Sequence, residues 1–441
     1  MLEAIGLPSL EALFEDVPAP LRFPRLELPP PASEPEVERE LEDLAARNLD
    51  VHRRPCFLGA GSYRHYVPAT VEAVLERGEL ATAYTPYQPE LSQGSLQATF
   101  EYQSMICALT GMDVATASHY DGATALAEAV LMALDAAGER RKVLLASTLN
   151  PQYREVVETY LRGADAHVQS AAGGDGKGDL INAIDDETAA VVIQSPNFFG
   201  QFEPVPRFAE AAHRLGAQLI VVPDPIALGL FRSPGEEGAD LVAAEGQPLG
   251  IPLGYGGPHL GIVAVREKLM RRLPGRLVGE TVDADGARGY VLTLTTREQH
   301  IRRHRATSNI CTNAALMAIA AAVYLATLGR SGLRQVATLC YQKSHYAARR
   351  IADIPGCRIN PRAPDDDFFK EFVVELPVAA GEVNARLLEE FDVIGGYDLA
   401  ELEPRLDRQL LVAVTETNAR SEIDRFVDAL DEILRARGAT S

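Results

Sequence analysis

The chain has 441 residues, of which 46% are hydrophobic and 24% charged, enough apolar material for a large core in one α/β domain with a smaller attachment. A formal net charge of -20 argues against nucleic-acid binding, because phosphate backbones attract basic surfaces. The five cysteines include no CxxC pair, which predicts reduced thiols and no metal site. We expect neither a signal peptide nor an apolar run of membrane length, and therefore a soluble, cytoplasmic protein.

The first 60 residues predict an N-terminal arm and a helix. Proline and leucine are frequent in residues 1–35, and a polar helical segment follows to residue 48. A stretch rich in glycine and tyrosine comes next, and apolar residues then recur at helical spacing between Gly94 and Gly111. We expect the arm to lie on a neighbouring chain or on the body of the protein.

Strand-like and helix-like segments alternate from residue 113 to residue 266. This alternation predicts a mostly parallel sheet with helices on both faces. A hairpin-like stretch, a long helical region from Asn313 to about Arg350 and a short alternation of strands and helices complete the chain. We predict a large α/β domain over residues 61–330 and a small α+β domain over residues 331–441.

A glycine-rich loop joins two apolar strand-like runs within residues 239–261. Glycines let a backbone approach a ligand closely, and loops at the carboxyl ends of strands are where α/β proteins place their chemistry. Enzymes that hold pyridoxal phosphate on a lysine have loops of this build, but this loop contains no lysine. The chain has only five lysines, namely Lys142, Lys177, Lys268, Lys343 and Lys370. None occupies the strand-to-loop position after Asp224 that a Schiff base needs, so aldimine chemistry by this chain alone is not expected.

Two further places are candidates for cofactor contacts. Asp224 follows the apolar run LIVVP, so its carboxylate stands at the end of a strand and could pair with a pyridine nitrogen. A strand-end Asp that caps the next turn is the alternative interpretation. Gly122 and Thr124 open a strong helix whose free amides could bind a phosphate, although an ordinary N-cap by Asp121 explains the same residues.

Residues 296–312 form a basic segment that contains Arg297. A guanidinium there could bind a substrate carboxylate or a phosphate held by a partner. A solvated or subunit-facing basic segment is the alternative. His259, in the glycine-rich loop, is interpreted as a hydrogen-bonding loop residue and not as a base.

Six motifs resemble, in the same order and over nearly the whole chain, the N-terminal half of the glycine decarboxylase P-protein of the glycine cleavage system. The motifs are AYTPYQPELSQG, TGMDVATAS, SPNFFG, IPLGYGGPH, PGRLVGETVDADG and TREQHIRRHRATSNICT. P-proteins occur as one long polypeptide or as two subunits of half that length, and this chain resembles the first subunit of the split form. The resemblance implies the aminotransferase-like fold, which is fold type I of the pyridoxal-phosphate enzymes.

The resemblance also implies where the cofactor is bound. In the family the C-terminal half carries the lysine, and matching the two halves puts Gln247 at the corresponding position of this chain. Pyridoxal phosphate would then be held covalently by a lysine-bearing partner, in a heterodimer or a pair of heterodimers. Glycine would form an aldimine there and lose CO2, and the aminomethyl group would pass to the lipoyl group of the H-protein.

Active sites of this fold lie between subunits, so the resemblance implies that this chain completes the partner's site. The candidates for residues that reach across, chosen from the two most distinctive motifs, are Tyr84, Thr85, Tyr87, Arg297 and Asn309. Gly122, Thr124 and Asp224 would be vestiges of a cofactor site. Two alternatives stay open, namely a self-sufficient aminotransferase-like enzyme with a displaced lysine and a purely structural scaffold subunit.

Overall fold

A computed structural model describes residues 1–51, 53–170 and 177–438 of the chain. The chain divides into two compact units, Met1–Asp50 and Val51–Ser441. The first unit contains two α-helices, α1 (Leu2–Ile5) and α2 (Glu34–Ala45). The second unit contains both main sheets and all the remaining α-helices of the described residues.

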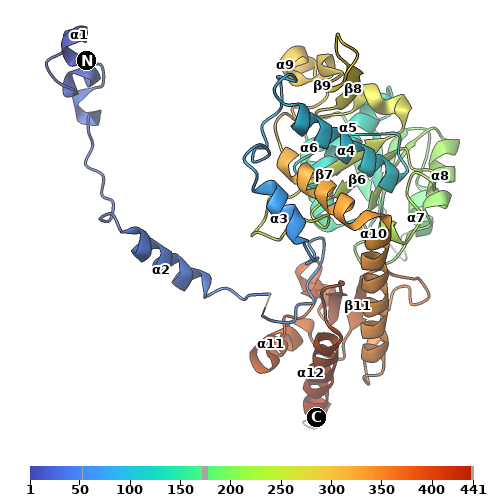
Figure 1. Ribbon diagram of the computed structural model, residues 1–441. Coiled ribbons are helices and arrows are strands. Elements are labelled where there is room, and N and C mark those ends of the chain that lie inside the picture. The colour runs from blue at the N-terminus through green and yellow to red at the C-terminus, as the bar shows by residue number, and fades with distance from the viewer. Residues whose placement is uncertain (52, 171–176, 439–441) are drawn as a thin grey trace. The chain divides into compact units, whose positions relative to one another are not determined.

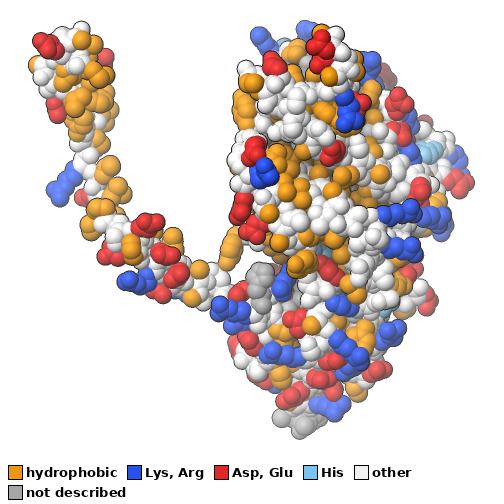
Figure 2. All heavy atoms as spheres, viewed as in Figure 1, with side chains coloured by type: hydrophobic (Ala, Val, Ile, Leu, Met, Phe, Trp, Pro, Cys, Tyr) orange, Lys and Arg blue, Asp and Glu red, His pale blue; other side chains and the backbone are white. Residues whose placement is uncertain are grey.

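The first unit has no core of its own. Its sequence alternates prolines with isolated leucines, and none of the residues of α1 and α2 is buried. Phe23 and Leu28 are 61% and 73% exposed, and Figure 2 shows hydrophobic side chains at the surface of this segment. Helix α2 is instead stabilised at its first turn by a capping box, in which Glu36 accepts the backbone N–H of Ser33 at 2.7 Å.

A seven-stranded sheet in the order β1-β7-β6-β5-β4-β2-β3 forms the centre of the second unit. Its strands are β1 (Val114–Ala115), β2 (Lys142–Leu145), β3 (His167–Ser170), β4 (Thr188–Ser195), β5 (Gln218–Pro223), β6 (Leu241–Glu245) and β7 (Gly261–Val265). Strands β2 to β6 pair in parallel, whereas β7 is antiparallel to both of its neighbours. The predicted mostly parallel sheet is therefore confirmed. β7 turns back because the loop after β6 contains no crossover helix, which a parallel connection requires.

Helices cover both faces of this sheet, as Figure 1 shows. They are α3 (Ala69–Leu75), α4 (Gln93–Thr110), α5 (Gly122–Ala136), α6 (Pro151–Leu161), α7 (Lys177–Asn182) and α8 (Val205–Arg214). Buried side chains of α4 and α8, such as Ile106 and Phe208, belong to one apolar cluster. Buried side chains of α5 and α6, such as Val130 and Val157, belong to a second cluster on the other face. The short helix η3 (Ala227–Gly229) follows β5, and β8 (Val278–Val282) and β9 (Arg288–Leu292) form the expected hairpin.

A smaller antiparallel sheet in the order β10-β11-β13-β12 completes the chain. Its strands are β10 (Arg358–Ile359), β11 (Glu371–Glu375), β12 (Tyr397–Asp398) and β13 (Gln409–Ala413). Helices α11 (Ala380–Phe391) and α12 (Arg420–Gly438) bury their apolar sides in its core. The predicted combination of a large α/β part and a small C-terminal α+β part is confirmed.

Helix α10 (Ala315–Ala352) runs from the large sheet to the small one (Figure 1). By length and composition it could cross a membrane, which differs from the expectation that the chain has no such run. It packs against α3 and α4, and small side chains such as Ala320 are completely buried. Gly329, at φ 58°, interrupts its helical geometry. These contacts are those of a core helix.

Candidate functional site

Asp224 stands directly after β5, at the carboxyl edge of the parallel sheet, as the sequence predicts. Its Oδ1 accepts the N–H of Ile226 at 2.9 Å, so Asp224 caps the next turn, as the alternative interpretation expects. Its Oδ2 lies 2.7 Å from Nζ of Lys370, which directly precedes β11. A lysine therefore reaches Asp224 after all, from the small sheet and not from the glycine-rich loop.

The ammonium group of Lys370 has three kinds of partner in a buried position. The residue is 2% exposed. Besides the Asp224 carboxylate, Nζ lies 3.0 Å from Nε2 of His65 and 3.6 Å from the ring centre of Tyr63. A carboxylate, an imidazole nitrogen and an aromatic face together replace the water that a buried cation has lost.

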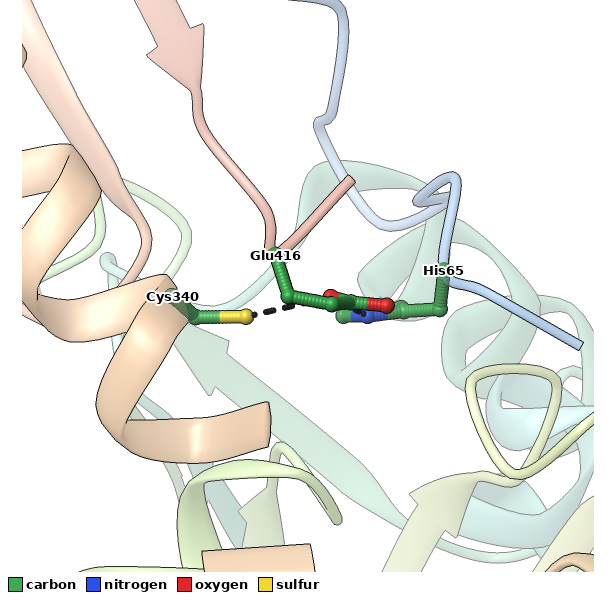
Figure 3. Close-up of side chains that lie close together, drawn as sticks. All are labelled: His65, Cys340 and Glu416. Carbon is green, nitrogen blue, oxygen red and sulfur yellow. Dashed lines mark hydrogen bonds and ion pairs between the residues drawn. The ribbon is translucent and has the colours of Figure 1, made fainter. Parts of the chain in front are cut away.

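A hydrogen-bond chain continues from His65 to the loop after β13 and to helix α10 (Figure 3). His65 Nδ1 lies 2.7 Å from Oε2 of Glu416, and Sγ of Cys340 lies 3.4 Å from the same oxygen. Burial and the Lys370 charge lower the pKa of His65, so a neutral imidazole donates Nδ1–H to Glu416. Burial also raises the pKa of Cys340 well above its usual value, so the thiol keeps its proton and donates it.

The same three side chains have the spacing that a metal ion could bridge, since their donor atoms lie within 4.8 Å of one another. The hydrogen bonds just described account for this spacing. A protonated thiol and a neighbouring lysine ammonium both oppose a bound cation.

The N-terminus of α5 has its own side-chain partners. Asp121 Oδ1 accepts the N–H of Thr124 at 2.9 Å, which is the N-cap of the alternative interpretation. The N–H of Gly122, which could otherwise bind a phosphate, donates to Oε2 of Glu245 at 2.9 Å. The other oxygen of Glu245 accepts the N–H of Gln247 at 2.8 Å. A carboxylate at the end of β6 therefore occupies the anion-binding end of the helix.

Gln247 begins the glycine-rich loop, and it is 2% exposed. Its Nε2 donates to the backbone oxygen of Ile251 at 2.6 Å, so its side chain ties the loop to itself. His259, at the other end of the loop, has Nδ1 3.5 Å from Oε2 of Glu245. The nearby Glu245 carboxylate raises the pKa of His259, although Nδ1 has no hydrogen-bond partner among the described residues. His259 is thus in contact with a carboxylate, and its interpretation as a hydrogen-bonding residue stays a prediction.

Asp224, Glu245 and Lys370, which come from separate elements, line one cavity at the carboxyl edge of the large sheet. Its polar lining includes Asn150, Gln194, Asp224, Glu245, Lys370 and Glu371. The chain folds tightly around it. Gly122 lies so close to its neighbours that a Cβ would be 2.3 Å from the hydroxyl of Tyr153 and 2.8 Å from the backbone nitrogen of Glu245.

A second group of predicted residues gathers where two motifs meet. Thr85 is buried, and its Oγ1 lies 2.8 Å from Oγ1 of Thr312. The hydroxyl of Tyr87 accepts a hydrogen bond from Nη2 of Arg276 at 2.6 Å and lies 3.6 Å from Sγ of Cys311. The structure therefore brings the first and the last of the six motifs together.

Arg297 lies beside this group and lines a cavity of about 300 Å³. Arg271, Arg272, Arg302 and Arg305 line the same cavity, together with the acidic residues Asp135 and Glu298. Burial and the charge of Arg276 lower the pKa of Arg297 to about 10. Its Nη1 donates to the backbone oxygen of Leu273, while Nε and Nη2 are buried without a hydrogen-bond partner among the described residues. The arrangement suits an anionic group.

The remaining two candidates are on the surface. Tyr84 is 68% exposed, with its ring 5.9 Å from that of Tyr87, and Asn309 is exposed in the basic segment. Sequence reasoning missed Arg276 and Glu245 in these sites. Arg276 lies inside one of the six motifs, so its position was available as a signal, whereas Glu245 has no signal beyond the end of a strand.

The model of the protein family described as "Glycine cleavage system P-protein" matches residues 1–430 of the chain. The chain belongs to this family. A protein of Thermomicrobium roseum named probable glycine dehydrogenase (decarboxylating) subunit 1 is 53% identical over 436 residues, 98% of this chain and 96% of that protein. The protein of the same name from Geobacillus kaustophilus is 50% identical, over 98% of this chain and 96% of that protein.

Solved structures agree on the fold. A crystal structure of glycine decarboxylase (P-protein) of the glycine cleavage system, in inhibitor-bound form, has a TM-score of 0.90 and 44% identity, covering 98% of this chain and 97% of that chain. A glutamate decarboxylase of Lactobacillus brevis has a TM-score of 0.67 at 14% identity, covering 93% of this chain and 95% of that chain, and supports the fold alone. The predicted fold type I of pyridoxal-phosphate enzymes is confirmed.

Pyridoxal phosphate, the cofactor of this fold family, does not fit the residues around Asp224. Its ring nitrogen would meet an Asp224 oxygen that already holds the Lys370 ammonium at 2.7 Å. Its phosphate would compete with the Glu245 carboxylate at the α5 amide. Gln247, at the position expected for the lysine, has no amine with which to form the covalent link.

Proposed function

We propose that this chain is the lysine-less subunit 1 of glycine dehydrogenase (decarboxylating), the P-protein of the glycine cleavage system. The full-length likeness at 53% identity to a protein of that name supports the proposal most directly. Together with a lysine-bearing partner, the chain would decarboxylate glycine and deliver the aminomethyl group to the lipoyl group of the H-protein. The partner would hold the pyridoxal phosphate, which supplies the sink for the electron pair that remains when CO2 leaves.

The contribution of this chain would come from Tyr84, Thr85, Tyr87, Arg297 and Asn309. Tyr84 and Tyr87 expose 68% and 43% of their surface, so aromatic contact area is free for a partner. Arg297 lines a basic cavity and has two buried nitrogens without a hydrogen-bond partner among the described residues, which favours a carboxylate or phosphate brought by the partner's site. Buried Thr85 would hold the loop in place through Thr312.

The decisive experiment is to co-purify the chain with its lysine-bearing partner and to measure glycine-dependent CO2 exchange by the partner with and without this chain. Exchange that requires both chains supports the proposal, and full exchange by the partner alone contradicts it. Tyr84→Ala and Arg297→Ala should leave assembly intact and slow the exchange at least tenfold. Tyr160→Ala on α6 and Arg435→Ala on α12, both outside the motifs, are the matched controls.

One observation favours the alternative of a self-sufficient enzyme, because Nζ of Lys370 lies 2.7 Å from Asp224. The geometry opposes that alternative. An Asp that binds the ring nitrogen of pyridoxal phosphate lies at the opposite end of the ring from the aldehyde carbon that a lysine must reach. Borohydride reduction of the purified chain with pyridoxal phosphate should leave Lys370 unlabelled in peptide mass spectra, and labelling there would favour the alternative.

The scaffold alternative makes a different prediction for the same surface. If the chain only supports its partner, Tyr84→Ala and Arg297→Ala would leave the exchange rate of the assembled enzyme unchanged.

We also propose that the chain is cytoplasmic and that it assembles with its partner as a heterodimer or a pair of heterodimers. The five cysteines are free thiols, which suits a reducing compartment.

A further inference from the structure

We propose that Lys370 and Glu245 are permanent internal ligands of this chain's own pocket. Lys370 takes the place of the ring nitrogen of pyridoxal phosphate, and Glu245 takes the place of its phosphate. The pocket is thereby converted from a cofactor site into a polar joint between the two domains. This inference concerns the chain by itself, so it does not depend on glycine decarboxylation by the assembled enzyme.

The cation end of the pocket is complete without a ligand. A protonated ring nitrogen would bring one N–H⁺ to Asp224, and the Lys370 ammonium supplies the same charge at 2.7 Å. The remaining contacts of Nζ, to Nε2 of His65 at 3.0 Å and to the face of Tyr63, leave the ammonium with partners on several sides. A cofactor would have to displace a buried cation that is already paired, at the cost of leaving that charge without a partner.

The anion end is equally complete. Oε2 of Glu245 accepts the N–H of Gly122 at the start of α5, and Oε1 accepts those of Gln247 and Leu260 at 2.8 and 3.1 Å. Three backbone amides therefore already bind one negative group. A phosphate placed there would lie against the Glu245 carboxylate, and two like charges at contact distance repel each other.

The space that remains is too small for the cofactor. The cavity between these groups has a volume of about 50 Å³. A cavity of about 150 Å³ is what a single benzene molecule occupies in a protein core. Phosphorylated pyridoxal is larger than benzene, so side chains of this pocket would have to move to admit it.

The internal ligands also join separate parts of the fold. Lys370 directly precedes β11 of the small sheet and Asp224 directly follows β5 of the large one, so the two residues are far apart in the sequence. The chain of hydrogen bonds then passes through His65 to Glu416 and Cys340, which Figure 3 shows side by side. Removing the ammonium should therefore loosen the contact between the domains as well as open the pocket.

The test uses the full chain and pyridoxine 5′-phosphate, which has the ring and the phosphate but no aldehyde and so cannot react with surface lysines. Binding is measured by titration calorimetry, and melting temperature by circular dichroism with and without the probe. The variants are Lys370→Ala, Glu245→Ala and their combination. Lys268→Ala is the control, because Lys268 pairs with Asp240 at 2.8 Å but its side chain is 61% exposed.

The wild-type chain should not bind the probe at millimolar concentration. Lys370→Ala should melt several degrees lower than Lys268→Ala, and the double variant should bind the probe and regain part of the lost melting temperature. Binding to the wild type at micromolar concentration would overturn the proposal, and so would a folded double variant that neither melts lower nor binds. If the double variant does not fold, the single variants are titrated instead. A Lys370→Arg variant that folds then supports the joint. The joint is refuted if Lys370→Ala folds and Lys370→Arg does not.

Discussion

Glu371 is a buried acid next to Lys370, and its replacement by glutamine should change how stability depends on pH. The residue is 5% exposed at the start of β11. Its carboxyl group accepts the N–H of Ala60 at 2.7 Å and the hydroxyl of Tyr63 at 2.5 Å. Burial raises the pKa of Glu371 from 4.5 to about 7, although these hydrogen bonds act in the opposite direction.

The sign of the effect follows from proton binding. Between pH 4.5 and pH 7 the folded chain keeps the Glu371 proton, whereas the unfolded chain releases it. The free energy of unfolding from this group is therefore largest below pH 4.5 and falls as the pH rises to 7. With about 1.4 kcal/mol for each pH unit in that interval, the loss amounts to about 3 kcal/mol.

Glu371→Gln removes this titration and keeps the shape of the side chain. We expect the variant to be within about 1 kcal/mol of the wild type at pH 5 and more stable than the wild type by about 2–3 kcal/mol at pH 8. Urea unfolding followed by circular dichroism at both pH values measures the difference. Other titrating groups are common to both proteins and cancel in it. Exposed Glu389→Gln is the control, and parallel pH profiles of wild type and Glu371→Gln would refute the reasoning.

Three further predictions concern the two sites. Gly200→Ala should destabilise the chain by about 2–4 kcal/mol in thermal unfolding, because φ is 90° and a Cβ would lie 1.9 Å from a carbonyl oxygen of β11. Cys311 should be the first cysteine to react with iodoacetamide at pH 8, and Tyr87→Phe should slow it severalfold, because the Tyr87 hydrogen bond lowers the pKa of Cys311. Asp224→Asn and Lys370→Met should each cost about 3–5 kcal/mol in urea unfolding, and the double variant clearly less than the sum of the two.

Each of these has a control within the chain. Gly78→Ala should be tolerated, since nothing lies within 4 Å of a Cβ at Gly78. Burial raises the pKa of Cys107 and of Cys357 to about 11, so both should stay unmodified while Cys311 reacts. Preferential labelling of Cys107 would contradict the reasoning. For the ion pair, strictly additive losses would mean that Asp224 and Lys370 do not interact.

The sequence predicts the large sheet and the position of Asp224 for a physical reason. Parallel strands buried on both faces appear as continuous apolar runs, such as the one before Asp224, and helices with one apolar side separate them. The first residue after such a run must lie at the carboxyl edge. The N-terminus of α5 is predicted on the same basis, since Asp121 and Thr124 form a local cap that depends on neighbouring residues only.

The partners of these residues could not be predicted in the same way. Lys370 lies 146 positions after Asp224, and its contact depends on how the small sheet packs against the large one. Glu245 reaches α5 because β6 ends beside it, which follows from the strand order and not from local pattern. Local sequence context alone therefore does not identify Lys370 as a lysine that reaches the site.

The Asp224–Lys370 pair is more informative about orientation than about stability. Apolar side chains of similar volume would stabilise a buried contact between two domains about as well as an ion pair, because the ion pair first loses its hydration. They would accept several packings, whereas the ammonium of Lys370 finds a carboxylate, an imidazole nitrogen and a ring face in only one position. Glu416 and Cys340 fix His65 in turn. We infer that the polar joint sets the angle between the large and the small sheet.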